Sequence, residues 1–164
     1  MSAIPSSRIP AQLPSWHLRP STDADLEPLA DLRAVVMRPD LERLGRYDEH
    51  RVRQRLRDSF STAHTAIIVV GDDFAGSVTL RPAEGDGQWL EHFYLAPRHQ
   101  GRGLGSDVLR AVLAQADARG QTMRLNVLQG SPARRLYERH GFTVESQDPV
   151  DVFMTRPPAT VPAV

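Results

Sequence analysis

The sequence predicts an α/β domain in which helices flank one sheet, and three observations support this fold class. The chain has 164 residues, enough for one hydrophobic core but not for two full domains. Segments in which apolar residues recur every second position alternate with segments in which they recur every third or fourth position, as strands and helices require. Its 40% hydrophobic and 24% charged residues exclude a largely disordered chain.

The first half of the chain carries the pattern of two helices among four strands. Leu32 and Arg33 fall on one face of the first helix, while residues 37–45 show no period and are expected to be irregular. Val52 and Leu56, spaced four apart among arginines, mark the second helix. The predicted elements are a strand over 16–19, helices over 22–36 and 48–60, and strands over 66–70, 74–80 and 88–95.

Beyond Pro97 the apolar period changes from two residues to three or four. Val108 and Val112 share one helix face, and Ser131 and Pro132 supply the N-cap and first residue of another helix. The predicted elements are a helix over 104–120, a strand over 122–128, a helix over 131–140, and strands over 142–146 and 152–155. The expected order is therefore β-α-α-β-β-β-α-β-α-β-β.

Both ends of the chain are rich in proline and show no period. Residues 1–14 and 157–164 are expected to be flexible tails, and residues 15–156 to form the domain. The first residues lack the features of a signal peptide, and no apolar run reaches the roughly 20 residues that span a bilayer. A cytoplasmic protein without a membrane partner is therefore expected.

Charge and composition exclude several kinds of chemistry. The 20 basic residues balance 20 acidic residues, so the chain has no overall field that favours nucleic acid. Cysteine is absent and every basic residue is arginine, which excludes thiolate metal sites, cysteine nucleophiles and lysine Schiff bases. The six histidines lack metal-ligand spacing, so no metal is expected.

The most informative segment covers residues 95–106, where a strand end, three alternating glycines and a helix start follow one another. Glycines let the backbone approach a ligand closely, and the free N–H groups of a first helical turn bind anions. Arg102 adds a positive charge, so a phosphate or pyrophosphate site is predicted. A dinucleotide fold is excluded because Ser106 replaces the third glycine and no acidic residue ends the next strand.

Two motifs in the right order resemble those of the GNAT (GCN5-related) N-acetyltransferases. Gln100-Gly-Arg-Gly-Leu-Gly105 is similar to the signature that holds the pyrophosphate of acetyl-CoA, and residues 133–142 are similar to a second motif. The strand ending in Phe93-Tyr-Leu95 also resembles the strand before that signature. The resemblance covers residues 16–156 and implies the GNAT acyl-CoA N-acyltransferase fold, with a mixed, mostly antiparallel central sheet and flanking helices.

The resemblance implies acetyl-CoA as the donor and direct attack of a primary amine on its thioester in a ternary complex. Strand backbone would pair with the pantetheine arm, and loop backbone would bind the pyrophosphate. The implied cofactor-binding residues are Phe93, Tyr94, Leu95, Gln100, Gly101, Arg102, Gly103, Leu104, Gly105, Ser106 and Tyr137.

The resemblance also implies two catalytic residues. Tyr137 would protonate the leaving thiolate, although a core tyrosine whose hydroxyl finds a partner is the alternative. Glu91 would deprotonate the amine, with water as the alternative. Because neighbours on a strand point to opposite faces, Glu91 and His92 are expected on opposite faces. Glu91 would then share its face with Phe93 and Leu95.

The acceptor is expected to be a small-molecule or peptide amine. Tyr47 and Asp48 lie in a segment that is similar to one wall of the acceptor pocket in a set of bacterial GNAT proteins. Relatives dimerise through their last strands, which leaves a homodimer open. The alternative function is a non-catalytic GNAT-like domain that binds acyl-CoA. A nucleic-acid face on residues 46–57 is a further alternative, which Asp58 and other acidic residues interrupt.

Overall fold

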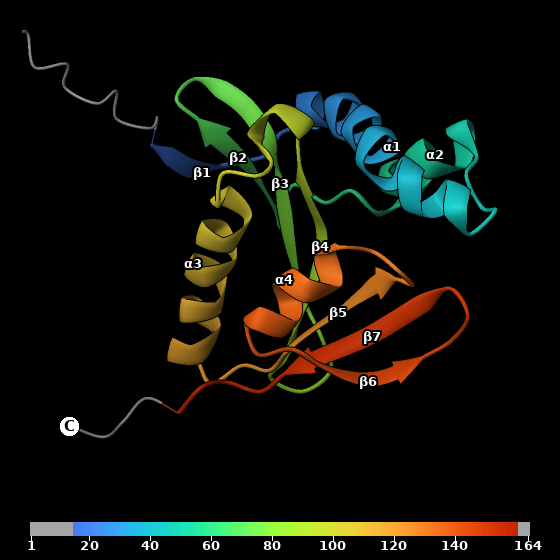
Figure 1. The fold of residues 1–164 in the computed structure, drawn as a ribbon. Coiled ribbons are helices and arrows are strands. Elements are labelled where there is room, and N and C mark those ends of the chain that lie inside the picture. Colours follow the sequence, from blue (N-terminus) through green and yellow to red (C-terminus); the bar gives the residue numbers. More distant parts are fainter. Residues whose placement is uncertain (1–14, 161–164) are drawn as a thin grey trace, which may run out of the picture.

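Seven strands form one twisted sheet in the computed structural model, which describes residues 15–160. Their spatial order is β1-β2-β3-β4-β5-β7-β6, and the pairing of β4 with β5 alone is parallel (Figure 1). The strands are β1 (Trp16–Pro20), β2 (Thr65–Val70), β3 (Asp73–Pro82), β4 (Gln88–Leu95), β5 (Met123–Leu128), β6 (Thr143–Gln147) and β7 (Asp151–Arg156). The predicted sheet and element order are confirmed.

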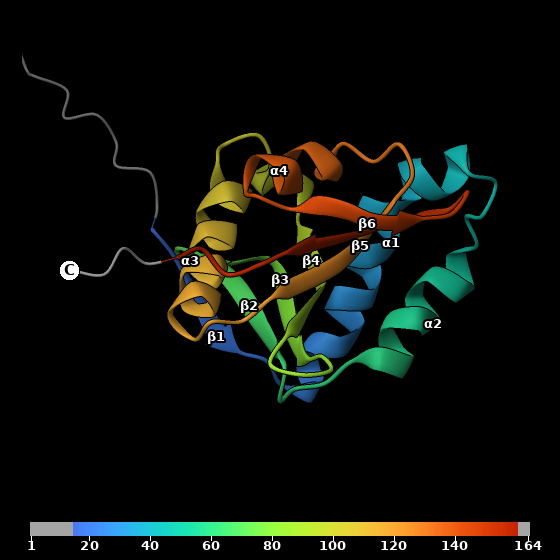
Figure 2. The ribbon, with the colours of Figure 1, turned by 90° about the horizontal axis from the view of Figure 1, so that it is seen from below.

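Helices cover both faces of the sheet (Figure 2). The helices are α1 (Leu26–Arg43), α2 (Glu49–Ser59), α3 (Leu104–Ala118) and α4 (Ala133–Arg139), with short 3-10 turns at η1 (Asp23–Asp25) and η2 (Pro97–His99). One hydrophobic core joins α3 and α4 to the sheet around Val108, Leu125 and Phe142. A second joins α1 and α2 to the other face around Leu29 and Leu56.

The first long helix extends further than the sequence predicted. Residues 37–43 were expected to be irregular, but α1 continues to Arg43 with Pro39 inside it. Its last turns contain polar pairs instead of an apolar stripe, because Arg38 contacts Glu42 at 2.6 Å. Arg43 also donates to the Gln129 carbonyl at 2.5 Å, which ties the end of α1 to the loop after β5.

The sheet opens between β4 and β5. These two strands pair at only two positions, Gln88 with Met123 and Trp89 with Arg124. Beyond Trp89 the carboxyl end of β4 has no partner on that edge, so its backbone groups face the gap between the strands.

The two predicted tails, residues 1–14 and 157–164, lie mostly outside the described residues. The predicted tail over residues 1–14 lies outside the described residues, as do residues 161–164 of the second tail. Residues 157–160 form neither helix nor strand, and Ala159 N donates to the Asp117 carboxylate at 2.8 Å. Within residues 15–160, no helix is both long and apolar enough to cross a membrane.

Candidate active site

The glycine-rich loop has the geometry of an anion site. Gly101 and Gly103 have φ angles of 75° and 82°, in the left-handed region that side chains disfavour. The first hydrogen bond of α3 runs from Asp107 N to the Gly103 carbonyl at 3.1 Å, which leaves the N–H groups of the preceding turn without a helical partner. A Cβ atom on either glycine would meet nothing within 4 Å, so the backbone is open to a ligand.

The remaining loop residues place and tether the loop. Gln100 Nε2 donates to the Leu95 carbonyl at 2.9 Å, and Arg98 and His99 both contact Asp73 on β3. These contacts fix where α3 begins relative to the end of β4. Leu104 is buried in the core, while Arg102 is exposed beside the open backbone and Ser106 lies on the first turn of α3.

A bulge in β4 overturns the predicted facing of its side chains. His92 and Phe93 together oppose the single residue Val78 of β3, and His92 has a φ of 44°. Phe93 packs on the α3 side, whereas His92 bonds Ser59 of α2 on the other side.

Because of the same bulge, the prediction of the face on which Glu91, the candidate base, lies was wrong. Glu91 was expected to share a face with Phe93 and Leu95 and to oppose His92. Instead Glu91 bonds Arg81, which also donates to the Ser59 carbonyl, so Glu91 and His92 lie on the same α2 side. The expectation failed because strict alternation holds only for a regular strand.

Beneath the bulge, a hydrogen-bonded chain runs from α1 to α2. Arg33 Nε donates to Tyr94 Oη at 3.0 Å, and Tyr94 Oη donates to Nδ1 of a neutral His92, 3.1 Å away. His92 Nε2 then carries the ring hydrogen and donates to Ser59 Oγ at 2.8 Å. Ser59 Oγ in turn donates to the Arg55 carbonyl at 2.9 Å. The whole chain is consistent with a neutral imidazole.

Electrostatics supports that protonation state. Burial, together with the nearby guanidinium groups of Arg33 and Arg81, lowers the pKa of His92 to about 4. Burial also raises the pKa of Tyr94, so its phenol stays protonated at neutral pH. His92 is therefore a poor proton acceptor for an amine.

Tyr137 is largely buried, and its hydroxyl is not fully enclosed. The residue is 8% exposed and stacks edge-on against Phe142, with ring centroids 5.7 Å apart. Among residues 15–160, Gln121 Oε1 alone is a fully enclosed side-chain polar atom without a partner. The Tyr137 hydroxyl has no bond to those residues either, so it touches solvent. Burial raises the pKa of Tyr137, which keeps it protonated.

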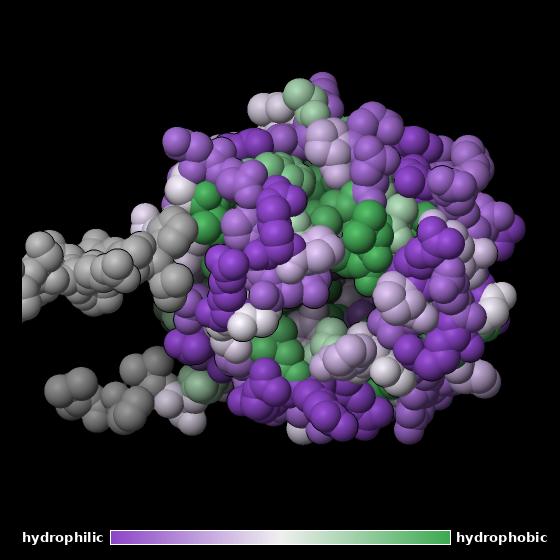
Figure 3. All heavy atoms as spheres, turned by 45° about the horizontal axis from the view of Figure 1, so that its top comes forward, coloured by the Kyte–Doolittle hydropathy of each residue, from purple (hydrophilic) through white to green (hydrophobic). Residues whose placement is uncertain are grey.

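The surface around the opening is apolar at its centre. Figure 3 shows hydrophobic residues gathered around a hollow, with hydrophilic residues along its rim. An apolar hollow with a few convergent polar groups is the usual form of a small-molecule site.

Tyr47 and Asp48 lie between α1 and α2, as predicted, and both have structural contacts. The Asp48 carboxylate caps α2 by accepting from Arg51 N at 2.7 Å. The guanidinium of Arg38 lies over the Tyr47 ring, 4.7 Å from its centroid.

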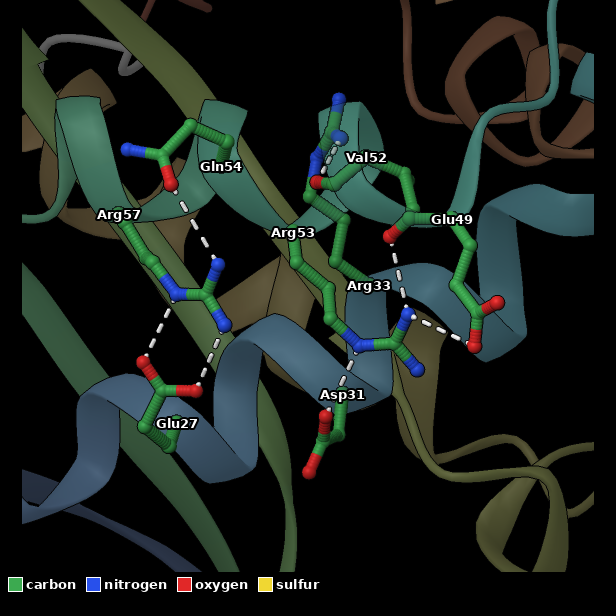
Figure 4. A network of polar contacts seen from close by, with 8 residues as sticks. All are labelled: Glu27, Asp31, Arg33, Glu49, Val52, Arg53, Gln54 and Arg57. Atoms are coloured by element: carbon green, nitrogen blue, oxygen red, sulfur yellow. Dashed lines mark hydrogen bonds and ion pairs between the residues drawn. The ribbon is translucent and has the colours of Figure 1, made fainter.

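Two of the four arginines of α2 pair with acidic residues. Arg57 contacts Glu27 at 2.8 Å, and Arg53 contacts Asp31 at 3.0 Å (Figure 4). These ion pairs join α2 to α1, so the arginine-rich segment is largely an interhelix contact. The side chains of Arg51 and Arg55 make no ion pair with residues 15–160.

Sequence reasoning missed the hydrogen-bonded chain of Arg33, Tyr94, His92 and Ser59. One signal was present, because Arg33 stood on the apolar face of the predicted first helix. Within residues 15–160 no three His, Asp or Glu side chains gather as metal ligands.

Comparison with known proteins decides the family. The model of the acetyltransferase (GNAT) family matches residues 29–142, well over half of the chain. The chain belongs to the GNAT family. Acetyl-CoA is the acyl donor of GNAT enzymes, in agreement with the donor expected from the sequence. Comparison with curated protein sequences gives no match.

Solved structures share this GNAT fold at low sequence identity. PaiA N-acetyltransferase from Thermoplasma acidophilum, in complex with coenzyme A, has a TM-score of 0.70 and 21% identity, covering 87% of this chain and 99% of that one. An acetyltransferase from Thermus thermophilus gives 0.67 and 22%, covering 87% and 97%. The ribosomal-protein-S18-alanine N-acetyltransferase from Escherichia coli gives 0.65 and 17%, covering 90% and 96%.

Proposed function

We propose that this GNAT protein transfers the acetyl group of acetyl-CoA to a primary amine by direct attack in a ternary complex. The observation that carries the proposal is the juxtaposition of an open glycine-rich helix start with the unpaired end of β4. A helix start of this kind binds the phosphates of a nucleotide-like carrier. The unpaired end of a strand accepts an extended chain as an added strand.

On the donor side, the residues fit acetyl-CoA. The backbone N–H groups from Gly101 to Ser106 would bind the pyrophosphate, and Arg102 would add a charged contact. The backbone of Tyr94 and Leu95 that faces the gap would pair with the pantetheine amides, beside the Leu95 carbonyl that Gln100 already binds. The Phe93 side chain packs beneath on the α3 side. The bound donor supplies an activated thioester carbonyl.

Two side chains are proposed to move protons. Tyr137, protonated and open to solvent at its hydroxyl, would protonate the departing thiolate. Glu91 keeps one carboxylate oxygen on Arg81 at 2.7 Å and is 33% exposed, so its other oxygen would take the amine proton directly or through water. The neutral amine then attacks, and coenzyme A and the acetylated amine leave.

Calorimetric titration with acetyl-CoA tests the donor site, with NADPH as a control for nonspecific nucleotide binding. Micromolar binding of acetyl-CoA but not of NADPH is expected. No binding of acetyl-CoA would refute the proposal.

Turnover separates the enzyme from a non-catalytic acyl-CoA-binding domain. We expect thiol release from acetyl-CoA in the presence of amines, and a roughly hundredfold fall in kcat in Tyr137→Phe with unchanged acetyl-CoA affinity. Phe142→Leu, a packing change beside the same ring, serves as the matched control and should keep kcat near the wild-type value. Binding without turnover on any amine would favour the acyl-CoA-binding alternative.

A further inference from the structure

Arg33 is a buried cation without an acidic partner. Its side chain sits between α1 and β4 and is 8% exposed. Nη1 donates to the Val52 carbonyl at 2.5 Å and Nε donates to Tyr94 Oη, both uncharged acceptors (Figure 4 shows the Val52 contact). No Asp or Glu oxygen of residues 15–160 lies within ion-pair distance of it. Such a charge is costly to bury unless an anion joins it.

One nitrogen of Arg33 remains available. Nη2 bonds no group among residues 15–160, yet it is not an enclosed unpartnered atom, so it reaches the accessible surface beside Tyr94. The other two nitrogens hold the guanidinium in place. The side chain is therefore preorganised to present one donor edge to a ligand.

A second unpaired guanidinium lies at the rim. Arg55 is exposed on α2, one turn before Ser59 and hence on the same helix face. Its side chain makes no ion pair or hydrogen bond with residues 15–160, unlike Arg53 and Arg57. Ser59 on that face bonds His92, so Arg55 lies at the α2 end of the network, and its charge is close enough to Tyr94 to favour ionisation of the phenol.

The charges around this network are unbalanced. Three guanidinium groups, those of Arg33, Arg55 and Arg81, face one carboxylate, Glu91, which Arg81 already binds. His92 adds no charge, because its imidazole is neutral. The acceptor side of the opening therefore carries a net positive charge that an anionic ligand would neutralise.

We propose that the amine acceptor carries an oxyanion group, a carboxylate or a phosphate, that Arg33 and Arg55 bind. This inference rests on the proposed acetyltransferase function and names its substrate class. The group anchors the acceptor against α1 and α2 while its amine extends toward the opening between β4 and β5. Two guanidinium groups around one oxyanion give charge-assisted hydrogen bonds from both sides.

The test measures binding of matched probes to the protein saturated with coenzyme A. The carboxylate probes are glycine, β-alanine and 4-aminobutyrate, each compared with its carboxamide, and phosphoethanolamine is compared with ethanolamine. We expect at least one anionic probe to bind tenfold or more tightly than its neutral partner. The chemical group of the tightest probe identifies carboxylate or phosphate as the preferred oxyanion.

Two variants locate the effect. Arg55→Gln on the surface should weaken the anionic probe about tenfold, and with active enzyme should raise KM while kcat is kept. Arg33→Gln should weaken it further, with folding checked by circular dichroism. Arg119→Gln removes an exposed arginine at the C-terminal end of α3. This control should change neither the affinity for the anionic probe nor the KM.

The outcomes separate the two proposals. Absence of coenzyme A binding refutes the acetyltransferase function itself. Coenzyme A binding with equal affinity for charged and neutral probes, or with a preference that survives Arg55→Gln, overturns only the oxyanion site.

Discussion

The two sides of the opening between β4 and β5 differ in the groups that line them, which are backbone N–H groups on one side and side chains on the other. On the proposed donor side, a short loop and one helical turn offer backbone N–H groups from consecutive residues. On the proposed acceptor side, side chains from α1, α2 and β4 meet in one hydrogen-bonded chain. The backbone site suits acetyl-CoA, the donor of GNAT enzymes, whereas the side-chain site can be changed by substitutions to suit a particular acceptor.

The difference explains why one side is easy to recognise from sequence. A backbone site leaves a local motif, because glycines are needed where φ is positive or a ligand approaches closely. A site of side chains leaves residues that are tens of positions apart, such as Arg33 and His92, with no common spacing.

The largest effect is expected where the two sides meet, at Gly76 of β3. A Cβ atom there would overlap the Tyr94 carbonyl oxygen and lie 3.1 Å from Leu95 Cα. Gly76→Ala should therefore separate β3 from β4 and lower the free energy of unfolding by about 3 kcal/mol or more, or abolish folding. Urea unfolding followed by circular dichroism measures this.

Gly105→Ala is the matched control for that substitution. Its Cβ would meet Leu95 and Leu136 side chains at 3.5 and 3.7 Å, which is ordinary contact. It should unfold at nearly the wild-type urea concentration. Equal stability of the two alanine variants would contradict the close approach at Gly76.

On the donor side, Gly103→Ala should cost affinity as well as stability. An alanine at its φ of 82° is strained by about 1–2 kcal/mol, and relief of that strain moves the N–H groups of the loop. We expect at least a tenfold loss of coenzyme A affinity by calorimetry. Gly120→Ala has a similar φ of 64° and equally open space, but lies at the other end of α3. It should lose comparable stability and keep full affinity.

On the acceptor side, stability should depend on pH through His92. Its folded pKa of about 4 lies below the unfolded value of about 6.5, so the unfolded chain binds more protons between these values. Stability is therefore complete above pH 6.5 and falls as the pH drops toward 4. Between pH 7.5 and pH 5 the loss from this group should be about 2 kcal/mol.

The matched variant for this measurement is His92→Asn, because asparagine tolerates a positive φ and does not titrate. Urea unfolding at both pH values should show a smaller decrease in the variant than in the wild type. An identical decrease would mean that His92 is not held neutral by its surroundings.

The smallest effect is expected at the entrance to α2. Asp48→Ala removes the cap and should cost about 1 kcal/mol, whereas Asp48→Asn keeps a capping oxygen and should cost little. The asparagine variant thus isolates any role of the charge in acceptor binding, read as KM for the amine. A stability loss as large in Asn as in Ala would argue against the capping contact.

Much of the fold followed from periodicity and glycine placement. Residues 88–95 were predicted with the bounds that β4 has, and the helix start at Leu104 was also correct. The last turns of α1 were missed because polar pairs such as Arg38 with Glu42 hold them, and these leave no apolar period.

The candidate site was predictable only in part. The loop at Gly101 and Gly103 has the conformation that the motif requires. The roles proposed for Glu91 and Tyr137 stay predictions. The facing of Glu91 was wrong because a bulge at His92, a residue with no unusual sequence context, breaks the alternation that the prediction assumed.

That bulge makes the number of residues in β4 as important as their identities. Two residues, His92 and Phe93, occupy the space that one would fill in a regular strand opposite Val78. Deleting His92 would leave Phe93, Tyr94 and Leu95 on their present faces but would straighten the strand. A chain one residue shorter would keep every motif but would change the path of β4 beside the opening to β5.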